Sequence, residues 1–367
     1  MTASTRLGQR ALNRALLGRQ HLLSRTTMPA LDLIEHLVGV QAQAPLAPYV
    51  GLWNRLDGFK PNELAELLLS RRAVRTWVMR STIHLVSDTD ALRLRPLVRP
   101  VLENGFTGHF GRYLDGLDVA AVVAAGTELL EERPRTRTEL RDLLGARWPD
   151  HNADALAYAV SYLTAGVQVT PRGVWGETGP AAITTVHSWL GRPLDPEPSI
   201  DDLVLRYLTA FGPAGVADVQ LWSGLTRLRE VVDRLPLRVY VDAAGNELYD
   251  VPDVVLPDPD TPAPVRFLPE YDNVLLSHAD RTRLIPAGRR VPLPPGNGAT
   301  TGTVLIDGTF DALWKIRRAG GGHVVQIDPY RKLTPAEQTA LADEARRLVG
   351  FVATGTSSVD IEFHPPS

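Results

Sequence analysis

One pattern recurs three times along the chain: a group of short amphipathic helices followed by two β-rich strands around a tight turn. The third copy is the clearest, because Ser199 is a typical N-cap and Gly224 sits in a short turn between two helices. Its helices are expected at 200–211, 217–222 and 227–235, and its strands at 237–241 and 247–251. A helix, a glycine-containing turn and a second helix followed by a hairpin indicate a winged helix-turn-helix.

The two earlier copies have the same order of elements. In the first, helices are expected at 8–22, 28–38, 45–55, 62–70 and 88–103, and hairpin strands at 74–78 and 80–86. In the second, helices are expected at 119–131, 138–146 and 154–163, and strands at 167–170 and 174–176. Thr138 is the expected N-cap of the middle helix of that copy.

Proline residues mark a change of composition after Val254. Strand-like runs follow at 265–268, 274–276, 304–307, 310–317, 323–329 and 359–363, with one helix at 334–349. The predicted fold class is α+β, mainly helical, with three tandem winged helices and a β-rich C-terminal domain. The predicted boundaries are 1–115, 116–195, 196–256 and 257–367.

Several classes of protein are excluded by what the chain lacks. No run of 18 or more apolar residues is present, so no membrane span is expected, and cysteine is absent, so thiolate catalysis and cysteine-based zinc sites are excluded. No nucleotide-binding motif occurs, and the histidines lack metal-ligand spacing. We therefore expect no cofactor, no metal and no membrane partner, and a monomeric protein in the cytoplasm.

The net charge of −3 gives no bulk electrostatic argument for a nucleic-acid partner, but the basic residues are unevenly distributed. The segment from Arg71 to Arg112 contains eight arginines and only three acidic residues. A second cluster has no acidic residue within it and consists of Arg281, Arg283, Arg289 and Arg290. Such clusters are either solvated faces or contacts to backbone phosphate. Combined with three winged helices, they favour double-stranded DNA as the partner, with protein contacts as the alternative.

Two amide side chains stand close together at Gln41 and Gln43, between two predicted helices. On an α-helix they would lie about 200° apart, whereas in extended backbone they share one side. Pro45 disfavours the helical conformation for the residue before it. We therefore expect both amides to point together from an extended link. Buried amides need partners, which can be backbone, water or a ligand.

Three segments carry a resemblance to a known family. They are Gln41-Ala42-Gln43 with the following Pro45 and Gly51-Leu52-Trp53, the run Arg80–Val86, and the run Phe267–Leu276. Together they resemble the AlkZ-type bacterial DNA glycosylases, winged-helix proteins linked to self-resistance against azinomycin B. A related branch has Gln-x-Asp at this position, so Gln43 groups this chain with the azinomycin-resistance branch.

The resemblance implies a fold and an activity. The implied fold is a C-shaped array of three winged helices whose concave face takes duplex DNA. The implied activity is cleavage of the N-glycosidic bond at N7-alkylated purines, including bulky adducts and interstrand crosslinks, in DNA repair. An N7-alkylguanine already carries a positive charge, so its departure needs little acid. Two amides that position a water and the lesion suit such a base and suit a neutral base poorly.

Roles for individual residues follow as hypotheses. Gln41 and Gln43 are the predicted catalytic residues of a monofunctional glycosylase acting on alkylated purines in double-stranded DNA. Arg80 and His84 share one side of the first hairpin and are predicted to face the DNA, together with the second arginine cluster, while Tyr271 and Asp272 are predicted to be structural. The alternatives are a non-enzymatic winged-helix transcriptional regulator and a drug-sequestering protein. For a regulator, the amides would only cap the ends of their flanking helices, and a sequestering protein would bind free drug tightly without DNA.

Overall fold

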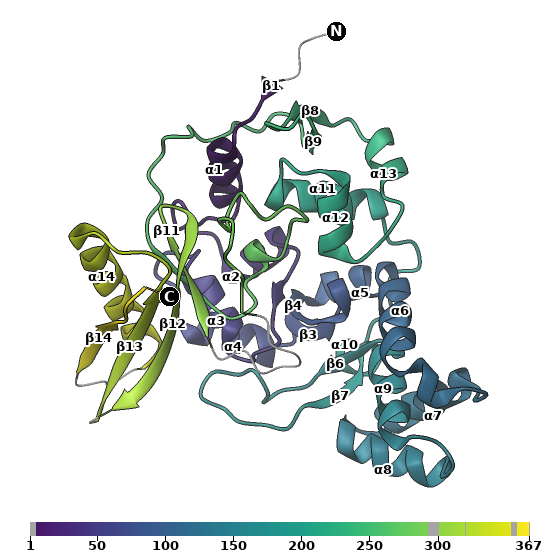
Figure 1. Cartoon of the computed structure of the whole chain (residues 1–367). Coiled ribbons are helices and arrows are strands. Elements are labelled where there is room, and N and C mark those ends of the chain that lie inside the picture. Colours follow the sequence, from purple (N-terminus) through teal and green to yellow (C-terminus); the bar gives the residue numbers. More distant parts are fainter. Residues whose placement is uncertain (1–4, 293–300, 320, 354–357, 367) are drawn as a thin grey trace.

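The computed structural model describes residues 5–292, 301–319, 321–353 and 358–366. Among these residues, short groups of helices alternate with strands that form three sheets (Figure 1). The predicted α+β class is confirmed, with more residues in helices than in strands. No helix in the described part of the chain is long and apolar enough to cross a lipid bilayer.

The first part of the chain contains the helices and strands that surround the glutamine pair. In order they are β1 (Thr5–Arg6), α1 (Gln9–Arg19), α2 (Ala30–His36), β2 (Val40–Gln41), α3 (Ala47–Trp53), α4 (Pro61–Leu69), β3 (Ala73–Trp77), η1 (Met79–Ser81), β4 (Ile83–Ser87), α5 (Asp88–Leu97) and α6 (Arg99–Phe110). The prediction of one helix over 88–103 is wrong, because Pro100 has no N–H to continue the ladder past Val98. Pro96 likewise leaves the carbonyl of Leu92 without a helical partner, and the N–H of Asp195 bonds to it at 3.1 Å.

The second part contains η2 (Gly111–Leu114), α7 (Val119–Glu132), β5 (Arg135–Thr136), α8 (Arg137–Arg147), α9 (Ala153–Leu163), β6 (Gly166–Gln168), β7 (Ala182–Thr185) and α10 (Val186–Leu190). The helix α8 begins before Thr138, the predicted cap. Thr136 and Glu139 form a reciprocal capping box, in which the Glu139 carboxylate accepts the Thr136 N–H at 2.8 Å.

The second hairpin also differs from the prediction. β6 pairs with β7 at 182–185, and not with the segment 174–176. That segment lies in turns, where the N–H of Val174 bonds to the carbonyl of Pro171 at 3.0 Å. Trp175 instead packs on Tyr49, with ring centroids 4.9 Å apart. The apolar residues at 174–175 therefore serve a contact with α3 and not a strand.

The hairpins of the first two parts join into one sheet. β3 pairs with β6 through Arg75–Gln168 and Thr76–Val167, which gives the order β2-β4-β3-β6-β7-β5. β4 is therefore an interior strand, covered on one edge by β2 and on the other by β3. All residues of β4, including His84, are buried.

The third part contains α11 (Ile200–Phe211), α12 (Val216–Ser223), α13 (Arg229–Arg234), β8 (Arg238–Val241) and β9 (Glu247–Asp250), in the order predicted. Gly224 follows α12 with φ of +81°, a left-handed conformation that glycine adopts without strain. The N-terminal strand β1 pairs in parallel with β8, and Arg19 of α1 forms an ion pair with Asp250 at 2.6 Å. β1 and α1 thus lie against the third part (Figure 1).

The last part contains β10 (Arg266–Leu268), η3 (Asn273–Leu275), β11 (Gly302–Ile306), β12 (Thr309–Ala319), β13 (Gly322–Pro329), α14 (Pro335–Val352) and β14 (Val359–Phe363). The strands form one five-stranded sheet in the order β10-β11-β12-β13-β14. The strand predicted at 274–276 is instead the helical turn η3, because the carboxylate of Asp272 accepts the N–H of Val274 at 3.1 Å and caps it.

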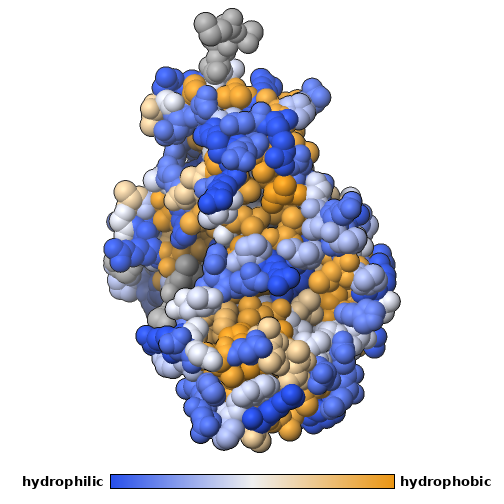
Figure 2. Space-filling model, turned by 90° about the vertical axis from the view of Figure 1, so that its right-hand side faces the viewer, coloured by the Kyte–Doolittle hydropathy of each residue, from blue (hydrophilic) through white to orange (hydrophobic). Residues whose placement is uncertain are grey.

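The hydrophobic cores cross the predicted boundaries between the four segments. One large cluster joins Leu16 of α1, Val86 of β4, Tyr207 of α11 and Leu305 of β11. A second cluster joins α2 and α3 to the C-terminal sheet and to α14, where Phe351 stacks on Trp53 at 5.8 Å. The division of the chain into domains at 115, 195 and 256 remains a prediction, and the predicted segments contribute residues to the same hydrophobic cores. On the face turned to the viewer in Figure 2, the apolar residues form separate patches among polar ones.

Candidate active site

The glutamine pair lies in the extended link that the sequence predicts. Val40 and Gln41 form β2, which pairs with β4 so that Gln41 lies opposite His84. Residues 42–46 carry no helix, and α3 begins at Ala47. Pro45 and the partner strand β4 therefore hold this segment out of helical conformation, as expected.

The amide of Gln41 is buried and held by an arginine. Its side chain is 5% exposed, and its Oε1 accepts a hydrogen bond from Nη2 of Arg80 at 2.9 Å. An arginine N–H can only donate, so this contact fixes which end of the amide faces Arg80. The oxygen of Gln41 points to the guanidinium, and the amino group points elsewhere.

The amide of Gln43 replaces part of the sheet ladder. The N–H of Ala42 bonds to the carbonyl of Ile83 at 2.7 Å, but the carbonyl of Ala42 is taken by Nη2 of Arg75 at 2.9 Å. The N–H of Ile83 therefore has no main-chain acceptor on β2, and Oε1 of Gln43 accepts it at 3.0 Å. Both glutamine oxygens thus have protein donors, but the two amides are held by different elements.

Arg80 occupies the turn between β3 and β4, and not the strand that the alternation predicts. Its φ of +54° is left-handed, which is uncommon for a residue with a side chain. The guanidinium donates to the carbonyl of Trp222 at 2.8 Å as well as to Gln41, and among the described residues it forms no ion pair. Desolvation, followed by the nearby charge of Arg281, lowers the pKa of Arg80 to about 10. It remains a cation at neutral pH.

A cavity of about 930 Å³ opens beside these groups. Gln43, Arg80 and Trp77 line it from the first part of the chain, and residues of α6, α8, α9 and β7 line it from the other side. Gln41 is not among the residues that line this cavity, but its Oε1 is bonded to Arg80, which does line it. No carboxylate is present among the described lining residues.

Aromatic rings line part of this cavity. Phe110 of α6 stacks on Tyr158 of α9 with centroids 3.9 Å apart and planes at 15°, and the guanidinium of Arg137 lies 4.6 Å from the centroid of the Tyr158 ring. The rings therefore pack mainly on one another and on Arg137. They hold α6 against α9, and Trp77 lines the cavity from β3.

His84 does not fit the predicted contact with DNA. It lies on the interior strand β4 and is fully buried, with Nδ1 bonded to the carbonyl of Thr82 at 3.1 Å. Burial and the adjacent Arg80 lower the pKa of His84 to about 3, so the ring is neutral at physiological pH. The prediction is corrected because the alternation of residue types shows which side chains share one side of a strand, but it does not show whether other parts of the protein cover that side.

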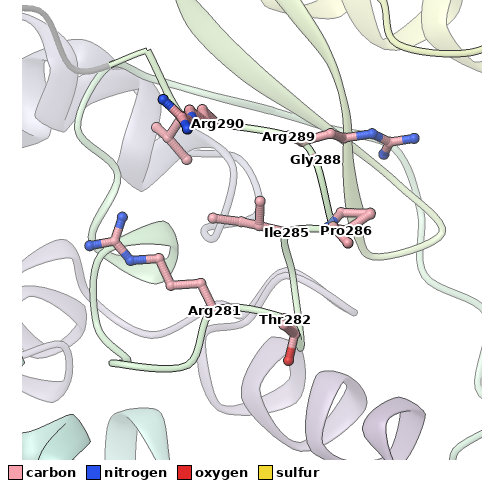
Figure 3. Close-up of a pocket in the computed structure, with 9 residues that line it drawn as sticks. Arg281, Thr282, Ile285, Pro286, Gly288, Arg289 and Arg290 are labelled. Atoms are coloured by element: carbon pink, nitrogen blue, oxygen red, sulfur yellow. The ribbon is translucent and has the colours of Figure 1, made fainter.

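The members of the second arginine cluster differ in burial and in their partners. Arg283 is 6% exposed and donates to the carbonyl of Pro213 at 3.0 Å, so the predicted phosphate contact does not fit it. Arg289 pairs with Asp311 and lies over the ring of Tyr330. Figure 3 shows Arg281 and Arg290 extending to the same side of their loop, whereas Arg289 extends to the opposite side. Arg281 and Arg290 form no ion pair with any described residue, and they remain the candidates for phosphate.

Residues from distant parts of the chain complete the surroundings of Gln41, and local patterns did not reveal them. Asn273 donates to the carbonyl of Gly39 at 3.1 Å and lies 3.5 Å from Nη2 of Arg80 through Oδ1. Asp272 forms an ion pair with Arg55 in the interior, in agreement with its predicted structural role. Among the described residues, no group of three or more histidines or carboxylates is arranged to hold a metal ion.

Comparison with known proteins identifies the family. A family model described as "DNA glycosylase AlkZ-like" matches residues 34–351, a range that includes both glutamines. The structure is similar to that of the Streptomyces sahachiroi DNA glycosylase AlkZ, with a TM-score of 0.72 and 19% sequence identity over 98% of this chain and 100% of that chain. No curated protein sequence matches this chain. At this identity the structural match indicates a shared fold, whereas the family model spans most of the sequence. The chain therefore belongs to the AlkZ-like family of DNA glycosylases.

Proposed function

We propose that this protein is a monofunctional DNA glycosylase that hydrolyses the N-glycosidic bond of N7-alkylguanine and related cationic purines in double-stranded DNA. Its substrates include bulky natural-product adducts and interstrand crosslinks, and its role is repair that protects the producing cell from a genotoxic antibiotic. The observation that carries the proposal is the position of Gln43 and Arg80 on one large cavity, with the amide of Gln41 held by Arg80.

The chemistry of the cavity supports a leaving base that is already cationic. Its described lining contains amides, hydroxyls, arginines and one exposed histidine, but no carboxylate that would protonate a neutral base. When the bond from C1′ to N9 of an N7-alkylguanine breaks, both electrons go to the base and neutralise its charge. A water then bonds to C1′ and releases a proton to solvent. The protein needs to orient the reactants rather than supply a strong acid.

Tandem helix-and-hairpin units support DNA as the substrate. We infer that the helices before each hairpin, in the first three parts of the chain, are winged helices that embrace the duplex, and that Arg281 and Arg290 contact its backbone. A cavity of about 930 Å³ is larger than a purine needs and suits a base with a bulky substituent.

The test is base release from defined duplexes. The protein is incubated with DNA containing a single N7-methylguanine, with bulky N7 adducts and with an N7-linked crosslink, and released base and alkali-labile sites are measured. Release without strand cleavage, and without trapping by borohydride, is expected for a monofunctional enzyme. The variant Gln41→Ala/Gln43→Ala should abolish release. Binding to undamaged DNA without release from any substrate would instead indicate a transcriptional regulator, and tight binding of free drug a sequestering protein.

A further inference from the structure

Gln41 presents only one end of its amide for a ligand. Its oxygen accepts from Arg80 at 2.9 Å, and no described residue accepts a hydrogen bond from its Nε2. The residue is 5% exposed, and its Nε2 is not among the described buried polar atoms that lack a partner, so the amino group keeps a small accessible surface. An N–H at the surface of a largely buried side chain can donate to water or to an acceptor atom of a ligand. The unpaired amino group therefore points to a hydrogen bond that forms when substrate binds.

Arg80 is held in place from three directions. Nη1 donates to the carbonyl of Trp222, which lies in the last turn of α12, where carbonyls lack helical partners and the helix dipole favours a cation. Nη2 donates to Gln41 and lies 3.5 Å from Oδ1 of Asn273. Asn273 is itself bonded to the carbonyl of Gly39, just before β2. Arg80 thus connects Gln41 to the third and last parts of the chain.

We propose that Arg80 is a positioning residue that orients Gln41 as a hydrogen-bond donor to the departing base. This inference rests on the proposed glycosylase function and deepens it. As the C1′–N9 bond breaks, the electron pair moves onto the purine, and its acceptor atoms O6 and N3 become stronger acceptors. A donor placed at such an atom binds the transition state more strongly than the ground state. Arg80 acts through Gln41, so its own contact with backbone phosphate is not required.

The substitution Gln41→Glu separates a donor role from an acceptor role. The carboxylate retains an oxygen for Arg80 and gains an ion pair with it, but it has no N–H to donate. Thermal stability should be unchanged or raised, while single-turnover excision of N7-methylguanine should fall by about 10²-fold, as when one preorganised donor is removed. Excision at the wild-type rate would overturn the inference, because Gln41 would then act through its oxygen or not at all.

The substitution Arg80→Lys tests positioning directly. A single ammonium group cannot donate to both Trp222 and Gln41 with the geometry of a guanidinium. Excision at saturating protein should fall roughly 10- to 100-fold, while the Kd for duplex DNA stays the same. A weaker Kd with normal excision at saturation would show that Arg80 binds phosphate instead, and would overturn the inference.

Arg95 offers a matched control. Arg95 is buried, has a lowered pKa like that of Arg80, and donates to the carbonyls of Tyr162 and Thr164 at 2.7 and 2.6 Å. It does not line the cavity. Arg95→Lys should lose stability to a similar degree and retain excision at saturation. Equal losses of excision in Arg80→Lys and Arg95→Lys would mean that Arg80 has only a structural role.

A double-mutant cycle and a spectroscopic measurement complete the test. If Arg80 acts through Gln41, Arg80→Lys should have no further effect on excision in a Gln41→Ala background. Losses that multiply independently would contradict this. The side-chain amide signals of Gln41 in ¹⁵N-glutamine-labelled protein should shift in Arg80→Lys and not in Arg95→Lys. This readout does not need activity, so an inactive wild type would refute the proposed function while leaving the positioning contact to be judged separately.

Discussion

Arg55 and Asp272 form a two-pronged ion pair in the interior, with Nη1 to Oδ2 and Nη2 to Oδ1 both at 2.8 Å. Each side chain is 2% exposed. The pair connects α3, which follows the glutamine segment, to the capped turn η3 that presents Asn273 to Arg80. It therefore supports the position of the site from a distance.

Removing one charge of this pair should destabilise the protein strongly. Asp272→Asn leaves a buried guanidinium without a counter-ion, which typically costs about 3–5 kcal/mol in the free energy of unfolding. Urea denaturation followed by circular dichroism measures the change. The exposed pair Arg99–Glu103 is the control, and Glu103→Gln should change stability by less than about 0.5 kcal/mol. Similar small effects in both variants would contradict a structural role for Asp272.

Gln43 should contribute to stability as well as to excision. Gln43→Ala leaves the buried N–H of Ile83 without its acceptor, and this should lower the free energy of unfolding by about 1–3 kcal/mol. Gln43→Glu keeps an oxygen for that N–H and should retain more of the stability. Measured in parallel, excision should be lost in Gln43→Ala even at temperatures where the variant is fully folded. An active, folded Gln43→Ala would limit the residue to its structural role.

Local signals in the sequence predicted most elements but not their partners. The Ser199 cap and the Gly224 turn identify the helices of the third part because both act within a few residues. The partner of β6 was mispredicted because the strand at 182–185 follows a long connection whose Trp175 packs elsewhere. Strand pairing depends on tertiary contacts that periodicity does not encode.

The same limit applies to the site. Alternation placed Arg80 and His84 on one side of a strand, whereas Arg80 lies in a left-handed turn and His84 is buried on an interior strand, paired with Gln41. The arginine cluster indicated positive charge but not direction, and Arg283 points into the protein. The extended conformation at Gln41 was predictable because Pro45 acts on its neighbours. Its side chain is bonded to Arg80, and Arg80 in turn contacts Trp222 and Asn273, residues that only folding brings together.

Acid should destabilise the protein through its buried histidines. The pKa of His84 is lowered from 6.5 to about 3, so below about pH 6.5 the unfolded chain binds a proton that the folded protein does not. Stability is therefore complete above pH 6.5 and falls as the pH decreases towards the folded-state value. One such histidine lowers the free energy of unfolding by up to about 2 kcal/mol between pH 6.5 and 5.

His84→Asn keeps a donor for the carbonyl of Thr82 and should flatten this part of the profile of stability against pH, measured by urea denaturation at each pH. An unchanged slope would mean that His84 does not remain neutral in the folded protein.

Arg281 and Arg290 should differ from the buried Arg283 in their effects on DNA binding. Arg281→Ala/Arg290→Ala removes two cations, the half-buried Arg281 and the exposed Arg290, that have no ion pair among the described residues, and Arg281 lies near enough to Arg80 to affect its pKa. If each neutralises one phosphate, the slope of log Kd against log salt concentration should decrease by about 0.9 per residue. The control is Arg283→Gln, which should leave the slope unchanged and lower stability, because the carbonyl of Pro213 loses its donor. Fluorescence anisotropy from 50 to 300 mM salt, at about physiological pH, measures both slopes. If the slope decreased in Arg283→Gln and stayed unchanged in the double variant, the assignment of the phosphate-contacting residues would be reversed.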